Sequence, residues 1–201
     1  MNTSLRLPDT EYFHEVAPKN LIVLHHTVGG SAKSTLDWWV TDPKRIGTAY
    51  LVERDGTVYE TFPPQMWASH INRKDAEGKQ IRSLEQRSIG IELCNEGPLT
   101  RRNGKFYCYD RVSERTEFTG PVFDCGKVWR DRWHFAAYPI LQIDAVADLV
   151  KNLCLLFLIP REIRSPEWIE DVAGLTGIVS HAQLRKDKSD VHLGFPLEVL
   201  L

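Results

Sequence analysis

The sequence lacks an excess of basic residues. Its 25 Lys and Arg residues stand against 27 Asp and Glu residues, so the formal net charge is −2, and the sequence pI is about 6.4. A protein that holds nucleic acid mainly by charge carries a clear basic excess. We therefore expect no nucleic-acid partner.

Long uninterrupted apolar segments are also missing. The first twenty residues contain no apolar run behind a basic start, so we expect no secretory signal and synthesis in the cytoplasm. Polar and charged residues interrupt the longest apolar stretch, residues 140–159, which excludes a membrane span. We expect a helix there, after Pro139, with a core-facing stripe of Ile143, Val146, Val150, Leu153 and Phe157.

Cysteine is scarce, and no CxxC pair occurs among Cys94, Cys108, Cys125 and Cys154. In a chain of this kind we expect free thiols rather than a disulfide framework. Internal repeats and low-complexity linkers are absent too. With 201 residues, of which 42% are hydrophobic, the chain is long and apolar enough for one folded domain spanning residues 1–201.

Several local patterns predict a mixed α/β fold. Residues 20–27 form an apolar, β-branched run typical of a strand covered on both faces, and Ser31 is a plausible N-cap for the helix that follows. Residues 48–61 surround Asp55-Gly56, the strongest hairpin signal in the chain. Further strands are expected at 88–94 and 177–181. Strands interleaved with helices indicate one domain with a mixed central β-sheet flanked by helices.

Two segments are harder to interpret. Residues 97–139 are rich in Arg, Gly, Pro and aromatics without a clear period, and we interpret them as a long excursion rather than a second domain. Trp129 and Trp133 lie in this excursion, and packing is the favoured role for them over a place in a substrate groove. The tripeptide 165–167 (SPE) has the pattern of a helix start, with a Ser N-cap and Pro at the first position.

Histidines near the ends of two predicted strands are candidate metal ligands. His25 and His26 close the first apolar strand, His181 closes the last, and Asp190 follows nine positions later. Two histidines and one carboxylate can hold a catalytic zinc ion and leave a fourth position for water. Because His25 and His26 face opposite sides of a strand that is apolar on both, spacing alone does not choose between them. Histidines bonded to the backbone and a solvated charged loop would explain the same pattern without metal.

Five segments occur in one order: IVLHHTVG at 22–29, the hairpin at 47–60, WASH at 67–70, SIGIELCNEG at 88–97 and SHAQLRKDKSD at 180–190. Together they resemble the N-acetylmuramoyl-L-alanine amidase family, which includes phage lysozyme-type amidases and the peptidoglycan-recognition proteins. The resemblance covers most of residues 20–96 and 176–196, and the excursion at 97–139 has no counterpart in it.

The resemblance implies a single Zn²⁺ ion held by His25, His181 and Asp190, with Asp187 as a rival for the third position. His26 is then a packed, hydrogen-bonded histidine. Val191 departs from the family, since many relatives have proline after the third ligand.

Three further residues take roles from the resemblance. Glu92 corresponds to the family's general base or water-orienting acid, Lys188 to the lysine that faces the developing oxyanion, and His70 to a histidine that lines the substrate groove. Thr48 stands where some relatives have a tyrosine, so acid–base work would fall to Glu92. A surface glutamate on an edge strand and an exposed loop histidine are the alternatives for Glu92 and His70.

The implied activity is zinc-dependent hydrolysis of the amide bond between N-acetylmuramic acid and L-alanine in peptidoglycan or muropeptides, by a monomer. The absent signal fits an endolysin that acts on the wall at lysis, a recycling enzyme acting on cytoplasmic muropeptides, or an exported effector. Alternatives are a peptidoglycan-binding module of the same fold and a zinc peptidase that cuts the stem peptide. A cysteine nucleophile at Cys94 is a weaker idea, since no histidine is tied to it by spacing.

Overall fold

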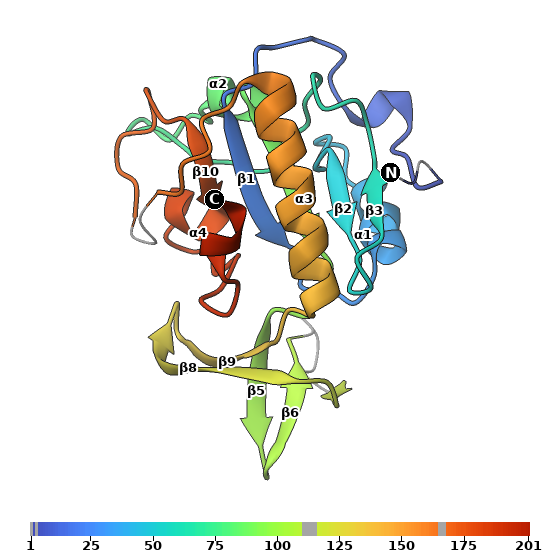
Figure 1. Ribbon diagram of the computed structural model, residues 1–201, viewed down its shortest axis with the longest axis vertical. Helices are drawn as coiled ribbons and strands as arrows, with labels where there is room; N and C mark the ends of the chain where they lie inside the picture. Colours follow the sequence, from blue (N-terminus) through green and yellow to red (C-terminus); the bar gives the residue numbers. More distant parts are fainter. Residues whose placement is uncertain (1, 3, 110–115, 165–167) are drawn as a thin grey trace.

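A mixed five-stranded sheet forms the centre of the computed structural model, which describes residues 2, 4–109, 116–164 and 168–201 (Figure 1). The strand order is β10–β1–β4–β2–β3, in which β10, β1, β4 and β2 are parallel and β3 is antiparallel to β2. The strands span Leu21–His26 (β1), Tyr50–Val52 (β2), Val58–Glu60 (β3), Ser88–Leu93 (β4) and Gly177–Ser180 (β10). The predicted mixed sheet is confirmed.

Strand β1 is buried on both faces, as its unbroken apolar run predicts. Leu21 and Val23 pack in one cluster with side chains of helices α2 (Arg82–Gln86) and α4 (His181–Leu184). Ile22 and Leu24 pack in the larger cluster with helix α3 (Ile140–Phe157), which lies across that face of the sheet in Figure 1. Because side chains alternate, His25 lies on the α2–α4 face and His26 on the α3 face.

The predicted helix starts and stripes are largely confirmed. Ser31 caps helix α1 (Ala32–Trp39), its side chain accepting from the backbone N–H of Ser34. The stripe of α3 is buried at Ile143, Val146, Val150 and Leu153. No helix among the described residues is both long enough and apolar enough to cross a membrane. Short 3₁₀ helices span Asp9–Glu11 and Leu197–Leu200.

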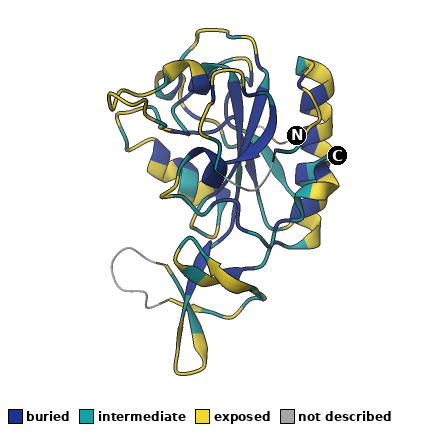
Figure 2. Cartoon of the chain, turned by 90° about the vertical axis from the view of Figure 1, so that its left-hand side faces the viewer, coloured by how far each residue is buried: buried dark blue, intermediate teal, exposed yellow. Residues whose placement is uncertain are grey.

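The excursion forms a second five-stranded sheet, here called the inserted sheet, which the sequence did not predict. Its strands run antiparallel in the order β7–β6–β5–β9–β8. Figure 1 places it at one end of the central sheet, and Figure 2 shows most of it exposed or half-buried. A sheet with little burial needs no strict apolar alternation, which explains the missing period. The strands span Pro98–Arg102, Lys105–Cys108, Glu117–Phe118, Val122–Trp129 and Arg132–Ala136 (β5 to β9).

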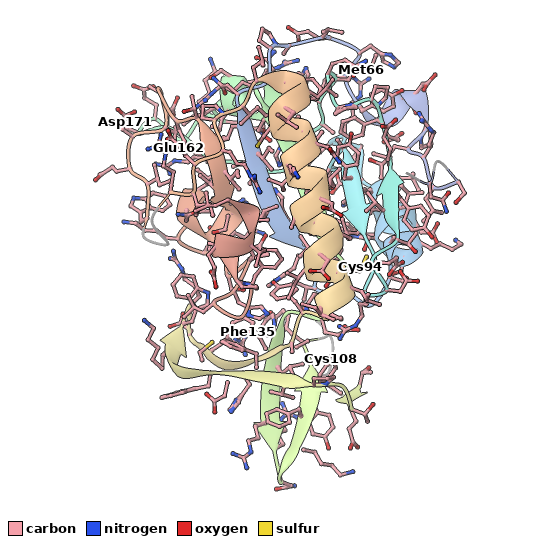
Figure 3. The ribbon with its side chains drawn as sticks, in the orientation of Figure 1. Met66, Cys94, Cys108, Phe135, Glu162 and Asp171 are labelled. Atoms are coloured by element: carbon pink, nitrogen blue, oxygen red, sulfur yellow. The ribbon has the colours of Figure 1, made fainter. Side chains whose placement is uncertain are left out.

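Aromatic stacking joins the inserted sheet to the rest of the molecule. Phe135, labelled at this junction in Figure 3, is fully buried, and its ring lies 4.5 Å from that of His192. Tyr138 stacks on His192 at the same distance. The sequence analysis favoured a packing role for Trp133. That prediction is wrong, because Trp133 is 51% exposed on the thin inserted sheet.

Two remaining predictions concern the cysteines and the tripeptide at 165–167. All four cysteines are described, none forms a disulfide, and Cys94 is buried. Burial raises the pKa of the Cys94 thiol, with the carboxylates of Glu53 and Glu92 adding to it, which disfavours a thiolate nucleophile. The helix start predicted at 165–167 lies outside the described residues.

Candidate metal centre and active site

A groove of about 1280 Å³ opens at the carboxyl ends of β1 and β4. Helix α1 forms one wall, and the inserted sheet forms the other through residues that include Cys108, Val128 and Arg132. Residues 185–190, which follow α4, also line the groove. All six predicted site residues line it: His25, His70, Glu92, His181, Lys188 and Asp190.

Three of the predicted residues bring their polar atoms together. His25 is at the end of β1, His181 begins α4 directly after β10, and Asp190 ends the loop that follows. The His25 Nδ1 atom lies 3.0 Å from His181 Nδ1 and 3.4 Å from Asp190 Oδ2. His181 Nδ1 lies 3.0 Å from the same carboxylate oxygen. This group forms a possible metal-binding cluster, and all three residues are buried.

The spacing of these atoms is close to that around a small tetrahedral ion: the separation of 3.4 Å matches it, and the two of 3.0 Å are a few tenths of an ångström shorter. Zinc bonds of about 2.0–2.2 Å place neighbouring ligand atoms roughly 3.3–3.6 Å apart in a tetrahedron. Two imidazole nitrogens and one carboxylate oxygen are also the donor types that zinc prefers in catalytic sites.

The hydrogen bonds behind His181 fix its tautomer. Its Nε2 lies 3.0 Å from the backbone carbonyl oxygen of Ile71, an atom that can only accept. Nε2 therefore carries the proton and donates it to Ile71. Nδ1 is left with a lone pair that faces Asp190 and His25.

A longer chain fixes the tautomer of His25. The Ser88 hydroxyl donates its single proton to the carbonyl of Glu85 over 3.1 Å, so Ser88 Oγ accepts from His70 Nε2, which is 2.9 Å away. His70 Nδ1 is then an acceptor, and it receives the Nε2 proton of His25 over 2.9 Å. His25 Nδ1 is again left with a lone pair directed at Asp190 and His181.

Two imidazole lone pairs and a carboxylate oxygen thus converge with no proton assigned between them. Burial lowers the pKa of His25 to about 4, with the charge of His181 adding to it, so the imidazole is neutral at pH 7. Burial alone would raise the pKa of Asp190, but its closeness to His181 and His25 holds that pKa well below its usual value. Neutral imidazoles and an ionised carboxylate are the forms that bind metal, so the residues fit a divalent cation.

Glu92 lies directly beside this cluster. Its strand, β4, is central in the sheet, which excludes the edge-strand alternative, and Glu92 is paired in register with His25. Burial and, to a smaller extent, the charge of Asp190 raise the pKa of Glu92 to about 8, against a lowering by Lys188. The carboxyl group is therefore close enough to both residues to respond to their charges.

The two rival ligands lie elsewhere. His26 hydrogen-bonds to the Tyr138 hydroxyl through Nδ1 at 3.0 Å, on the α3 face of the sheet. Asp187 pairs with Arg185, the shorter of its two contacts being 2.6 Å, and its side chain is 63% exposed. Neither belongs to the cluster that the described residues form.

His70 is held by residues that the sequence did not single out. Its side chain is only 4% exposed, and both ring nitrogens are hydrogen-bonded, to His25 and Ser88. The buried Glu85 accepts the backbone N–H of His70 over 2.9 Å. Gly90 leaves room beside the ring, because a Cβ there would lie 2.7 Å from Thr48 Cγ2 and 3.0 Å from His70 Nδ1. The signals were present as a glutamate and a serine in RSLEQRS and a glycine inside an apolar strand, but each is common.

A comparison of the sequence with protein-family models gives one match. The family model described as N-acetylmuramoyl-L-alanine amidase matches residues 15–192. No curated protein sequence matches the chain.

Solved structures share the fold. The amidase AmiD from E. coli, in complex with anhydro-N-acetylmuramic acid-L-Ala-D-gamma-Glu-L-Lys, superposes with a TM-score of 0.58 at 22% identity, over 93% of this chain. The chain spans only 58% of the length of AmiD. AmpD gives 0.55 at 15% identity, covering 100% of this chain and 93% of AmpD. The endolysin amidase LysCS from Clostridium intestinale URNW gives 0.52 at 17% identity, covering 100% and 90%. On the match over residues 15–192, the chain belongs to the N-acetylmuramoyl-L-alanine amidase family.

Proposed function

We propose that the protein hydrolyses the amide bond between N-acetylmuramic acid and L-alanine in peptidoglycan or its fragments, using one zinc ion. Family membership supports the reaction, and so does the complex of AmiD with a muropeptide. The observation that carries the proposal is the convergence of His25 Nδ1, His181 Nδ1 and Asp190 Oδ2 within 4.8 Å of one another. We further propose that residues 1–201 act as one catalytic domain and as a monomer.

In this proposal His25, His181 and Asp190 hold the ion, and the groove leaves its remaining side open to substrate. A zinc ion bound there would supply a Lewis acid that polarises the scissile carbonyl and acidifies a water molecule. The backbone carbonyl of Ile71 and the ring of His70 orient the two imidazoles. His70 is therefore proposed as a positioning residue rather than a substrate contact.

Glu92 is proposed as the general base. It takes a proton from the attacking water and delivers it to the leaving amine of L-alanine. The raised pKa of about 8 suits both halves of this task, since a base that titrates near neutral pH can also return its proton. Thr48 does not share the role, because its hydroxyl is committed to the carbonyl of Tyr50 over 2.8 Å.

Lys188 is proposed as the cationic side chain that stabilises the oxyanion. It lines the groove in the same loop as Asp190 and is close enough to Glu92 to lower its pKa. A fixed positive charge at this point favours the tetrahedral transition state, in which negative charge grows on the carbonyl oxygen.

The test is product analysis on two substrates with metal content measured in parallel. The purified protein is incubated with intact sacculi and with soluble muropeptides, and the products are identified by mass spectrometry. We expect free L-alanyl stem peptides and intact lactyl groups, together with one zinc ion per chain. Cleavage within the stem peptide would show a peptidase instead, and binding without cleavage would show a recognition module.

Comparing the two substrates also tests the biological type. Release from sacculi is expected of an endolysin or an exported effector, whereas activity confined to soluble muropeptides is expected of a recycling enzyme. The proposed reaction is the same in each of these cases, so either result is compatible with it.

A further inference from the structure

The turn at the tip of the β8–β9 hairpin contacts the loop that carries two of the proposed functional residues. The guanidinium of Arg130 donates to the carbonyl of Ala182 over 2.7 Å and to that of Lys186 over 2.9 Å. Beside it, the indole Nε1 of Trp129 lies 3.4 Å from the carbonyl of Ser189. Three hydrogen bonds therefore join the inserted sheet to residues 182–189.

These carbonyls flank the metal centre. Ala182 follows His181, and its backbone N–H donates to the carbonyl of Asp190 over 2.6 Å. Ser189 directly precedes Asp190, and Lys186 is two residues from Lys188. The hairpin tip thus holds both ends of the short segment between the second and third proposed ligands.

The backbone at the tip is unfavourable for the residues found there. Arg130 and Asp131 have φ angles of 49° and 63°, and Trp129 pairs directly with Arg132, so the two residues form a type I′ turn. Such turns favour Asn-Gly, because most side chains are disfavoured at positive φ. Because the positive φ of Arg130 is unfavourable for its side chain, we infer that this side chain has a role beyond forming the turn.

Arginine is also the side chain that this contact requires. Its planar fork can donate to two carbonyls at once, whereas a lysine ammonium on a flexible stem cannot fix both in one geometry. The Arg130 Nε atom is buried and has no hydrogen-bond partner among the described residues. The two terminal nitrogens are consequently the atoms through which this residue acts.

We propose that Arg130 is a positioning residue, which with Trp129 holds the loop of Lys188 and Asp190 in the geometry that the metal centre needs. This inference rests on the proposed function. It assigns the inserted sheet a part in building the active site, besides lining its groove.

The decisive variant is Arg130→Gly, because glycine suits the positive φ of the turn and removes the side chain that carries the guanidinium. Hydrogen exchange of the metal-free protein is measured first. We expect the amide protons of Ala182 and Lys188 to exchange at least tenfold faster than in the wild type, with the melting temperature unchanged or higher. Asp131→Gly is the matched control, since it relieves the same turn and keeps Arg130, and it should leave exchange unchanged.

Zinc affinity and kinetics follow on the same proteins. Substituting a residue that orients metal ligands typically weakens metal binding about 10–100-fold, and we expect Arg130→Gly to do the same. A purely structural role would lower the melting temperature and leave the zinc affinity of the folded protein unchanged. Arg130→Lys keeps the charge but not the fork, and we expect it to resemble Arg130→Gly; it serves as the test variant if the glycine variant does not fold.

The inference is overturned if Arg130→Gly folds and shows wild-type exchange in residues 182–190. Failure of the proposed function gives a different result, namely a wild type that does not release stem peptides. The exchange experiment needs neither metal nor turnover, so it decides the role of Arg130 in either case.

Discussion

His25 donates its Nε2 proton to Nδ1 of His70 across 2.9 Å, and this bond determines which nitrogen of His25 faces Asp190. The direction of this hydrogen bond depends on Ser88, on the other side of the His70 ring. The Ser88 hydroxyl donates its proton to the carbonyl of Glu85 and accepts a hydrogen bond from His70 Nε2. A serine remote from the groove thereby controls the protonation pattern of a proposed metal ligand.

Ser88→Ala tests this relay. Alanine removes the acceptor for His70 Nε2, so His70 can adopt the other tautomer and direct a proton at His25. We expect zinc affinity to fall about 10–100-fold with little loss of stability, measured by chelator competition and thermal melting. Ser83→Ala, an exposed change in α2, is the control and should behave like the wild type. Unchanged zinc affinity in Ser88→Ala would show that the relay does not orient His25.

Asp190→Ala and Asp187→Ala separate the two candidate third ligands. Removing the Asp190 carboxylate should abolish zinc retention, because two imidazoles alone hold the ion weakly. Asp187→Ala breaks only an exposed ion pair with Arg185 and should retain one zinc ion per chain. Elemental analysis of protein purified without chelator measures both. A zinc-free Asp187 variant beside a zinc-loaded Asp190 variant would reverse the assignment.

The central sheet was predictable because its strands are buried in ways that leave a pattern. An unbroken apolar run gave β1, and the Asp55-Gly56 turn gave the β2–β3 hairpin, whose Gly56 has a φ of 87°. The inserted sheet left no such pattern, since most of its surface faces solvent. Its hairpin tip uses Arg130 and Asp131 where turn chemistry favours Asn-Gly, so even the turn signal was missing.

Part of the candidate site could also be predicted from the sequence. Resemblance to the family selected His25, His181 and Asp190, and the structure brings these three together. Alternation placed His25 and His26 on opposite faces but gave no reason to prefer either one. The choice depends on what covers each face: α3 and Tyr138 cover that of His26, while His181 and His70 meet His25. Such tertiary neighbours cannot be derived from spacing.

Glu92→Gln should abolish turnover while zinc stays bound, because the amide is nearly isosteric but cannot accept a proton. In the wild type, kcat/KM should rise with pH as Glu92 ionises. A bound dication favours the carboxylate, so the apparent pKa should lie below the value of about 8 that burial and Asp190 produce without metal. A Glu92→Gln enzyme with wild-type turnover would remove Glu92 from the mechanism.

The same variant predicts a pH-dependent stability change in metal-free protein. The folded-state pKa of Glu92, about 8, lies above the ordinary glutamate value of 4.5, so the folded state holds this proton more tightly than the unfolded state does. That contribution is complete below pH 4.5 and is lost as pH rises through 8. Glu92→Gln removes the loss, so its melting temperature should exceed that of the wild type by a margin that grows from pH 5 to pH 8. A margin that does not change with pH would contradict the raised pKa.

Lys188→Met tests the proposed oxyanion contact. Methionine preserves much of the stem but removes the positive charge, so the loss should fall on the transition state rather than on substrate binding. We expect kcat to fall about 10²–10³-fold, as when one oxyanion donor is removed elsewhere, with KM changed little. Lys186→Met is the matched control: that ammonium lies 5.0 Å from the ring of Trp168, and its removal should leave kcat near the wild-type value. Equal losses in both variants would mean that the loop's overall charge, rather than Lys188 itself, supports the reaction.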